Sequence, residues 1–390
     1  MNHPLSWPAR KAREWAFRID EQFRGHPSPE LSAEAHAAAL VDWILRAQQA
    51  TPDDGVPQGY ESLTQTWMPS YPETTGYIIC SLLRAARHGI GKAIILREAA
   101  THMGLWLLSL QQPDGGYAGG HVGQSEAPAV FNAAQILKGF TDLVREGLDS
   151  TGRIRAAAAK TAQWLMAQQD ADGAWRRGVS TLTTEPVHTY YVRAAWPLGR
   201  YGKHLDNPEA VRAALKNADW VLAQRRPDGW VPHMNFHAGQ TPHAHTVAYT
   251  IQGLFELGML CSREDLIETA RQMALSMRRL QRPTGALPGR IGEGYTEAVR
   301  WSCTSANAQM AVAWYRLAKL TGDKAWGEAA DRAVDFNCSM HDLQHRDPNR
   351  RGAIRSAVPG HLGYCCYKYT NWAQKFFLDA LLARKGVVID

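Results

Sequence analysis

The sequence predicts an all-α protein, an (α/α)6 toroid of six helical hairpins with a short N-terminal helix. Helix endings that resemble "WLMAQQDADGAW" (Trp164 to Trp175) recur six times along the 390 residues. Between them, one amphipathic stretch alternates with one that is apolar on nearly every side. A fixed period indicates a repeat architecture. Because a helix with one solvated face lies outside and an apolar helix lies inside, the alternation predicts two concentric layers.

The period is read from a glutamine near the end of the first helix in each repeat. These glutamines stand about 60 residues apart. A turn that contains Asp-Gly or Thr-Gly follows in several repeats, where glycine allows the positive φ that ends a helix. We therefore expect the glutamines to bind backbone groups of the next repeat and not to be catalytic. They are Gln48, Gln111, Gln168, Gln224, Gln281 and Gln344.

The outer helices are expected where Ala, Leu and Trp form one stripe and Arg, Lys and Glu form another. Their expected ranges are 32–49, 91–112, 154–169, 208–224, 263–281 and 324–340. The inner helices are expected where charges are rare, as in "TTGYIICSLL" and "TVAYTIQGLF". Their expected ranges are 73–88, 129–146, 187–201, 243–260, 304–320 and 371–384.

Six hairpins can close into a ring or continue as an open solenoid, which needs polar capping repeats. The sequence favours closure, with residues 31–390 as a single toroid domain and residues 1–30 as an N-terminal capping segment. Within that segment, residues 10–23 form a basic amphipathic helix that packs on the body. A less favoured alternative is peripheral contact of this helix with a membrane or a partner.

Composition restricts the class of protein and its partners. No apolar run is long enough to span a bilayer, and the basic, proline-broken N-terminus does not resemble a secretory signal. Six scattered cysteines form neither a disulfide framework nor a zinc motif, so we expect reduced thiols, a cytoplasmic location, no metal and no cofactor. The net charge of +6 comes from dispersed Lys and Arg, so we expect no nucleic acid partner.

The helix ending from Leu165 to Trp175 resembles the QW motif of class II triterpene cyclases, in which Leu-x-x-x-Gln-x-x-x-x-Gly-x-Trp recurs. Protein prenyltransferase β subunits and several polysaccharide lyases are similar toroids. The segments "YPETTGYII", "VFNAAQILKGF" and "NWAQKFFLDAL" resemble toroidal proteins of bacterial exopolysaccharide biosynthesis loci. "SYPETTGYIICSL" is faintly similar to the helical domain of glucuronyl C5-epimerases. These resemblances imply the fold and a glycan substrate, and none assigns a reaction. The net positive charge leads us to expect that this glycan is an acidic oligo- or polysaccharide.

The N-terminal ends of the inner helices should meet at one face of the ring, where their free N–H groups favour anionic ligands. These ends are rich in Tyr, His, Asn, Thr, Glu and Arg, which suits a sugar with apolar faces and a hydroxylated rim. The catalytic candidates are Tyr71, Glu73, His188, Tyr190, Arg193, His245 and Tyr249. The substrate-binding candidates are Trp67, Tyr77, Asn132, Gln135, Tyr191, His243, Arg300, Thr304, Asn307, Tyr369, Asn371 and Lys375. The alternative for each residue alone is a helix cap or a satisfied buried polar group.

Two mechanisms fit these residue types. In the first, a base removes the C5 proton of a uronate in a lyase or epimerase reaction, while preorganised donors stabilise the carboxylate. The base is His245 or His188, the acid is Tyr71, Tyr190 or Tyr249, and the donors are Asn132 or Asn307 with Arg193 or Arg300. In the second, two carboxylates hydrolyse a glycoside. The candidates for that pair are Glu73, Glu126, Glu185 and Glu297.

Two other functions receive less support. Terpene cyclisation needs an Asp-x-Asp-Asp motif, and "TPDDG" at Thr51 lies in a turn and does not match it. A non-catalytic glycan-binding protein needs the same face but no acid and base beside the sugar.

Overall fold

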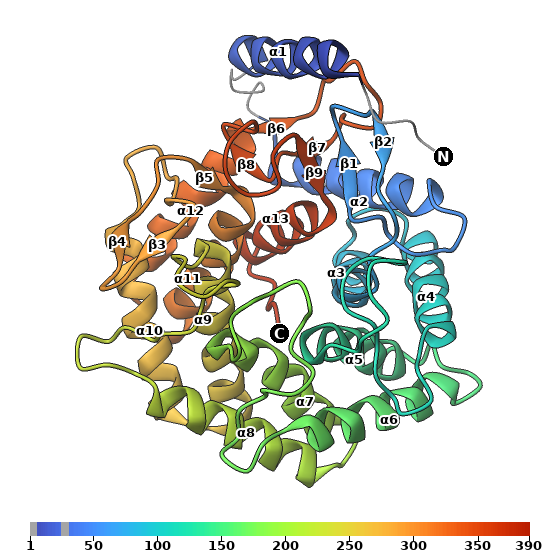
Figure 1. Ribbon diagram of the computed structural model, residues 1–390, viewed down its shortest axis with the longest axis vertical. Helices are drawn as coiled ribbons and strands as arrows, with labels where there is room; N and C mark the ends of the chain where they lie inside the picture. The colour runs from blue at the N-terminus through green and yellow to red at the C-terminus, as the bar shows by residue number, and fades with distance from the viewer. Residues whose placement is uncertain (1–5, 25–30) are drawn as a thin grey trace.

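The computed structural model describes residues 6–24 and 31–390, and in this part of the chain six inner helices surround the centre of a ring (Figure 1). Neighbours in the ring pack along their lengths, α3 on α5, α5 on α7, α7 on α9, α9 on α11 and α11 on α13. Contact between α13 and α3 completes the circle. The predicted closed toroid is therefore confirmed. The inner helices are α3 (Pro72–Arg87), α5 (Val130–Arg145), α7 (Val192–His204), α9 (Ala244–Cys261), α11 (Thr304–Thr321) and α13 (Asn371–Arg384).

A second layer of helices surrounds the first, and each outer helix is joined to an inner one by a loop (Figure 1). The expected ranges of the outer helices agree with the structure to within two or three residues at each end. Side chains such as Leu40, Trp43 and Ile44 of α2 face inward and are buried. The outer helices are α2 (Ala33–Gln49), α4 (Ala93–Ser109), α6 (Arg153–Gln168), α8 (Pro208–Ala223), α10 (Glu264–Arg279) and α12 (Lys324–Ser339).

Gln48, Gln111 and Gln281 join neighbouring outer helices as the sequence predicts, whereas Gln224 donates to the Trp220 carbonyl of its own helix. The Gln111 side-chain amide donates to the Ala157 carbonyl of α6 over 2.9 Å. The Gln281 amide donates to the Ala329 carbonyl of α12 over 2.9 Å. Between α6 and α8 the prediction needs a correction of one residue, because Gln169 and not Gln168 reaches the next helix.

Glycines allow two kinds of close approach in this ring. Gly285, in the turn after α10, has a φ of +88°, and a Cβ there would lie 2.0 Å from the Arg332 carbonyl oxygen. Gly76 of α3 faces α5, where a Cβ would lie 2.7 Å from the Ile136 Cα. The first glycine lets the turn after α10 lie directly against the next outer helix, α12. The second brings two inner helices together and keeps the ring narrow.

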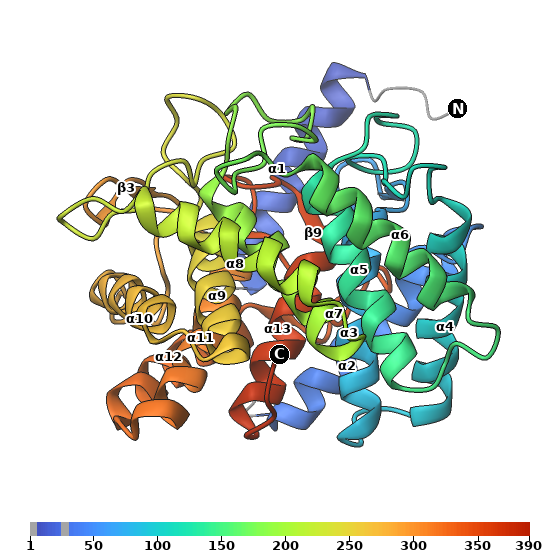
Figure 2. The same cartoon turned by 90° about the horizontal axis from the view of Figure 1, so that it is seen from below.

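Short strands occupy the loops at one end of the ring, the end where long loops gather in Figure 2. β1 pairs antiparallel with both β2 and β9, placing Tyr60 opposite Trp67 and Tyr369. This sheet joins the loop after α2 to the segment before α13. The strands are β1 (Gly59–Glu61), β2 (Thr66–Trp67), β3 (Ile291–Gly292), β4 (Thr296–Glu297), β5 (Ser302–Cys303), β6 (His341–Asp342), β7 (Ala353–Ile354), β8 (Ala357–Val358) and β9 (Lys368–Thr370).

Helix α1 (Trp7–Arg24) lies at the outer edge of the ring, beyond the loops that carry β6 and β8 (Figure 1). The Phe17 ring is buried against Tyr367, with centroids 5.2 Å apart. Ion pairs add to this contact, for example Glu21 with Arg355 at 3.1 Å. The helix therefore packs on the body, whereas the division into a capping segment (1–30) and a toroid domain stays a prediction. Residues 1–5 and 25–30 of that segment lie outside the described residues.

The seventh helix begins later than expected. The sequence predicts an inner helix from residue 187, but α7 begins at Val192 after the 3-10 turn η1 (Thr189–Tyr191). The Thr189 hydroxyl donates to the Pro232 carbonyl of a neighbouring loop over 2.5 Å. This contact holds the segment before α7 against that loop. Among the described residues no helix has the length and apolar character that a membrane span requires, and the six cysteines are free thiols.

Candidate active site

A cavity of about 250 Å³ opens at the loop end of the ring. Five of the six inner helices contribute side chains from their first turns or from the residues just before them. The loops after α2, α6, α8 and α12 contribute the rest of the lining. The predicted candidates that line the cavity are Tyr71, Glu73, Tyr77, Asn132, Tyr190, Tyr191, His245 and Tyr249.

Glu73 lies in the first turn of α3 and carries the only carboxylate that lines the cavity in the described part of the chain. Glu73 is only partly exposed at the cavity wall, and desolvation by the surrounding protein raises its pKa to about 8 because it disfavours the charged carboxylate. A hydrogen bond from the Tyr71 hydroxyl acts in the opposite direction and lowers the pKa. At neutral pH the Glu73 carboxyl group is therefore mainly protonated and is able to donate a proton.

His245 lies in the first turn of α9 and lines the same cavity. Its ring packs against Tyr249, with centroids 4.5 Å apart, and against Tyr364 at 5.4 Å. Burial lowers the pKa of His245 to about 4, and the charge of Arg193 lowers it further, whereas the neighbouring Gln309 raises it. The imidazole is therefore neutral at neutral pH and is able to accept a proton.

Aromatic rings make up most of the cavity wall. Phe131 lies 5.3 Å from Tyr249 and 5.5 Å from Tyr190, between ring centroids. On the other side, Trp372 lies 6.1 Å from Tyr71 and 6.0 Å from Tyr364. Such walls bind the apolar faces of a ligand, and the Tyr hydroxyls and the Asn132 amide supply polar groups at defined positions.

Two predicted histidines, His188 and His243, do not line the cavity and pack behind its wall. The His188 ring bonds the Thr183 hydroxyl at 3.2 Å and the Asn235 carbonyl at 3.1 Å. The His243 ring packs 5.0 Å from Tyr364 and 5.3 Å from Phe236, between centroids. Burial lowers the pKa of His188 to about 4 and that of His243 to about 3, so both rings are neutral. Neither His188, a catalytic candidate, nor His243, a substrate-binding candidate, lines the cavity.

Several predicted polar residues instead satisfy backbone groups of the rim. The Thr304 hydroxyl donates to the Arg355 carbonyl, and the Asn307 carbonyl oxygen accepts from the Leu287 N–H over 2.9 Å. The Asn371 amide donates to the Pro57 carbonyl over 2.8 Å. These three residues hold loops on the starts of α11 and α13, so their role is structural.

The remaining substrate-binding candidates on the loops are also placed elsewhere. Trp67 packs against Trp43 and Tyr60, with centroids 5.3 Å away in each case. The Tyr369 hydroxyl accepts hydrogen bonds from Arg350. Arg300 is exposed at the surface. None of these three predicted residues lines the cavity.

Gln135, Arg193 and Lys375 lie deeper in the ring than the cavity. The Gln135 amide donates to the Arg193 carbonyl over 3.3 Å. The Arg193 guanidinium donates to the Gln252 side chain over 2.9 Å, and the Lys375 ammonium donates to Asp379 over 2.6 Å. Neither cation lines the cavity, although Arg193 lies in the first turn of α7 and Lys375 is the fifth residue of α13.

The glutamate pair expected for glycoside hydrolysis does not form in this cavity. Glu126 is exposed. Glu185 bonds His233 at 2.7 Å and Asn235 at 2.6 Å. Glu297 forms an exposed ion pair with Arg282 at 2.8 Å. Only Glu73 of the four candidates lines the cavity.

Sequence reasoning missed the residues that the loops contribute. They come from segments between helices, where helical periodicity gives no signal about direction. Phe131 and Trp372 could have been predicted, because each is adjacent in the sequence to a predicted candidate, Asn132 or Asn371. The missed lining residues are Gln58, Thr74, Phe131, Ser180, Leu182, Thr183, Phe236, His237, Tyr364, Cys365 and Trp372. Within the described ranges no three His, Cys, Asp or Glu side chains are grouped so that they could hold a metal ion.

The chain matches no protein-family model and no curated protein. Its structure is similar to a sugar epimerase from a ruminal bacterium, with a TM-score of 0.71, 13% identity, and 90% and 97% of the two chains covered. It is similar to an unsaturated glucuronyl hydrolase specific for heparin, with a TM-score of 0.70, 17% identity, and 91% and 98% covered. A D-mannose isomerase has a TM-score of 0.70 at 13% identity, with 91% and 97% covered. At these identities the comparisons establish the fold, an (α/α)6 toroid over almost the whole chain.

Proposed function

We propose that this protein is a carbohydrate-active enzyme that transfers protons to and from one sugar unit, as an epimerase or isomerase does. The observation that carries the proposal is the pairing of a protonated acid, Glu73, with an unprotonated base, His245, in one cavity. Environments that move the pKa values of two groups so that acid and base coexist at neutral pH are typical of proton-transfer sites.

The proposed roles follow from the charge that develops during the reaction. His245 removes a proton from the carbon next to a carbonyl group, and Glu73 gives its proton to the carbonyl oxygen, which forms an enediol. Delivery of a proton to the opposite face of the same carbon by a second donor, such as the Tyr190 or Tyr249 hydroxyl, with return of the enediol proton to the Glu73 carboxylate, gives the epimer. Return to the neighbouring carbon gives the isomer. The Tyr71 hydroxyl, the Asn132 amide and the N-terminal ends of the inner helices are suited to stabilising negative charge on oxygen.

The size of the cavity supports a small ligand. Its volume of about 250 Å³ is near the lower end of the roughly 300–1,000 Å³ found for small-molecule sites. One sugar unit fits such a space, with any further units directed outward through the loops. This favours action on a free sugar or on a chain end over cleavage within a polymer.

The lining supports a neutral sugar more than a uronate. The acidic substrate expected from the sequence depended on Arg193 or Arg300 reaching a carboxylate. In the described part of the chain no Arg or Lys side chain lines the cavity. A sugar carboxylate placed there would be desolvated beside aromatic rings without a cation, which is costly. C5 chemistry on a uronate is therefore the weaker form of the proposal.

Hydrolysis remains the second candidate because solved neighbours include unsaturated glucuronyl hydrolases. A hydrolase that uses two carboxylates needs a partner for Glu73 at about 5–9.5 Å, and no second carboxylate lines the cavity among the described residues. Hydrolysis would thus require a mechanism in which Glu73 is the single acid.

The test is incubation of the protein with free hexoses and disaccharides in heavy water, followed by proton NMR. The proposal predicts a new epimer or isomer and deuterium at the carbon next to the carbonyl group. Glu73→Gln and His245→Asn should each abolish the exchange. Release of a monosaccharide from an unsaturated uronyl oligosaccharide, without deuterium exchange of neutral sugars, would favour hydrolysis and contradict the proposal.

A further inference from the structure

A second, much smaller chamber lies inside the ring, deeper than the candidate active site. Its volume is about 10 Å³, which is close to the smallest space that holds one water-sized particle. The middle parts of five inner helices surround it, together with Ile389 of the segment that follows α13. Its polar lining is unusual because it includes three cationic side chains, Lys138, Arg193 and Lys375.

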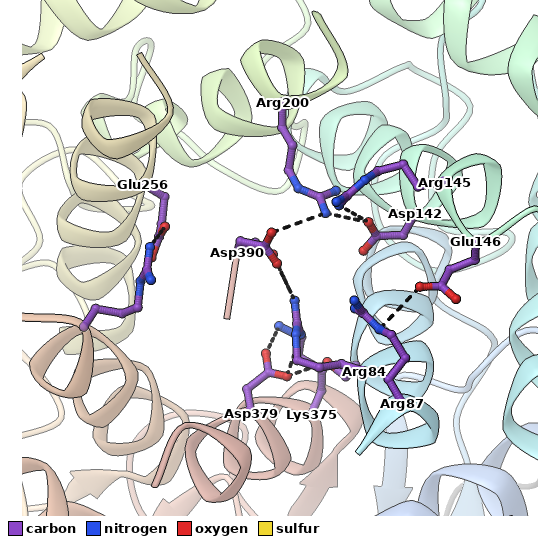
Figure 3. A network of polar contacts seen from close by, with 12 residues as sticks. Arg84, Arg87, Asp142, Arg145, Glu146, Arg200, Glu256, Lys375, Asp379 and Asp390 are labelled. Carbon is purple, nitrogen blue, oxygen red and sulfur yellow. Dashed lines mark hydrogen bonds and ion pairs between the residues drawn. The ribbon is translucent and has the colours of Figure 1, made fainter. Parts of the chain in front are cut away.

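The carboxylates of this region are already paired, as Figure 3 shows for most of them. Glu256 accepts two hydrogen bonds of 2.9 Å from Arg316. Asp379 accepts from Lys375 over 2.6 Å and from Arg84 over 3.3 Å. The acid groups nearest the chamber are therefore committed to these cations.

The carboxylates slightly further from the chamber are also paired with arginines. Asp142 accepts from Arg200 over 2.5 Å. Asp390 lies 3.4 Å from Arg84 and 3.9 Å from Arg200 (Figure 3). Of the three cations that line the chamber, only Lys375 forms an ion pair with a carboxylate among the described residues, and Lys138 and Arg193 form none.

Lys138 and Arg193 are both almost completely buried, at 1% and 2% exposure. The Lys138 ammonium lies 3.9 Å from the centroid of the Trp196 ring, and the Arg193 guanidinium lies 4.6 Å from the same ring. Arg193 also donates to Gln252, but its Nε has no hydrogen-bond partner. Cation–π contacts compensate only part of the cost of burying a charge.

We propose that this chamber binds a small monovalent anion, chloride under physiological conditions, between Lys138 and Arg193. A negative charge there balances the two cations and gives the Arg193 Nε an acceptor. Sulfate, phosphate and carboxylate ligands are too large for a space of this size. Chloride is only slightly larger than water, and the flexible Lys138 side chain is able to make the small adjustment.

Anion binding at this position is linked to a proton. Burial lowers the pKa of Lys138 well below its usual value, and the charges of Arg193, Lys375 and Arg200 lower it further. The Cys80 thiol of α3 acts in the opposite direction. Chloride stabilises the charged ammonium, so its binding raises the pKa of Lys138 and is accompanied by proton uptake. The other charged groups that face this region are Asp142, Glu256, Asp379 and Asp390.

Aromatic side chains that line the candidate active site also contact the cations of the chamber. The Lys375 ammonium lies 5.0 Å from the Tyr77 ring centroid, and the Arg193 guanidinium lies 5.3 Å from that of Tyr249. Tyr77 and Tyr249 also line the larger cavity. The proposed anion is thus positioned to stabilise the floor of that cavity, although its binding requires no sugar and no catalytic activity.

The first experiment compares thermal unfolding in sodium chloride and in sodium gluconate at equal ionic strength. Site-specific binding predicts a chloride-dependent rise of about 2–5 °C in Tm. The rise should persist in Lys160→Met, a substitution of an exposed lysine on α6, and disappear in Lys138→Met. Equal Tm values in both salts, or an equal chloride effect in both variants, would overturn the proposal.

The second experiment does not depend on any variant folding. Crystals grown in sodium bromide are measured at the bromine absorption edge. The proposal predicts an anomalous peak between the Lys138 Nζ and the Arg193 Nε. Bromide found only at surface residues would be an adventitious ion only, and that result, like a chamber that contains water alone, would overturn the proposal. Calorimetric titration of chloride in two buffers of different ionisation enthalpy then measures the proton uptake.

Discussion

The hydroxyl of Tyr71 donates a hydrogen bond to the carboxyl group of Glu73, two residues later at the start of α3. This bond favours the charged carboxylate, whereas burial opposes it. Tyr71→Phe should therefore raise the pKa of Glu73 above about 8 and move the alkaline limb of the activity profile to higher pH. The rate should fall because one donor is lost. A pH profile of kcat with an unchanged alkaline limb would show that the two groups do not interact.

The unmodified protein should have a plateau of activity between two limbs. Activity requires His245 without its proton and Glu73 with its proton. It should therefore decline below about pH 4, where His245 becomes charged, and above about pH 8, where Glu73 ionises. The measurement is kcat over this range with the reactive neutral sugar. A profile that rises through pH 8 would assign the acid role to another group.

Glu73 should also make stability depend on pH. Its pKa is raised from 4.5 to about 8 in the folded protein, so the folded state binds more protons than the unfolded state between these values. The favourable contribution is complete below pH 4.5 and is lost as the pH rises through 8, with a slope of at most about 1.4 kcal/mol per pH unit. Urea unfolding of Glu73→Gln should lack this component. Identical pH dependence in both proteins would contradict the assigned burial.

Two histidines provide a matched comparison of catalytic and structural roles. His245→Asn should reduce the rate by about 10²–10⁴-fold and leave Tm almost unchanged, because the ring faces the cavity. His188→Asn should lower Tm by several degrees, because His188 bonds Thr183 and the Asn235 carbonyl. The two variants are compared by activity assay and thermal unfolding. An equal loss of stability in both would place His245 in the core.

The glutamine contacts between repeats predict a stability difference between two similar substitutions. Gln281→Ala removes donors to the Gly285 and Ala329 carbonyls and should cost about 1–3 kcal/mol of unfolding free energy. Gln344→Ala is the control, because Gln344 is the corresponding residue of the sixth repeat and is exposed. It should change the free energy by less than about 0.5 kcal/mol. Similar costs at both positions would contradict the role of these glutamines as contacts between repeats.

The fold was predictable because its signals are local and repeated. An apolar stripe identifies the outer helices, and an almost uncharged surface identifies the inner ones. Gln111 and Gln281 mark the ends of outer helices. The start of α7 was not predictable, because Thr189 is held by the Pro232 carbonyl, which is distant in the sequence. The short strands were also missed, since segments of two or three residues have no measurable period.

The site was predictable only as a region. Helix starts indicate which residues approach the loop end of the ring, and this identified Glu73, His245 and Tyr249. Sequence does not give the direction of a side chain within the first turn, so Asn307 and Asn371 were assigned to the sugar although they bind loop carbonyls. Tyr364 lines the cavity but was not predicted, because its position depends on the path of a loop.

The most direct test of the central claim is a crystal structure of the protein with a bound neutral sugar or its open-chain alcohol. The account predicts one sugar unit in the cavity, with the Glu73 carboxyl group at an oxygen and the His245 ring at the adjacent carbon. A sugar bound outside the cavity, or bound with neither residue in contact, would contradict the account.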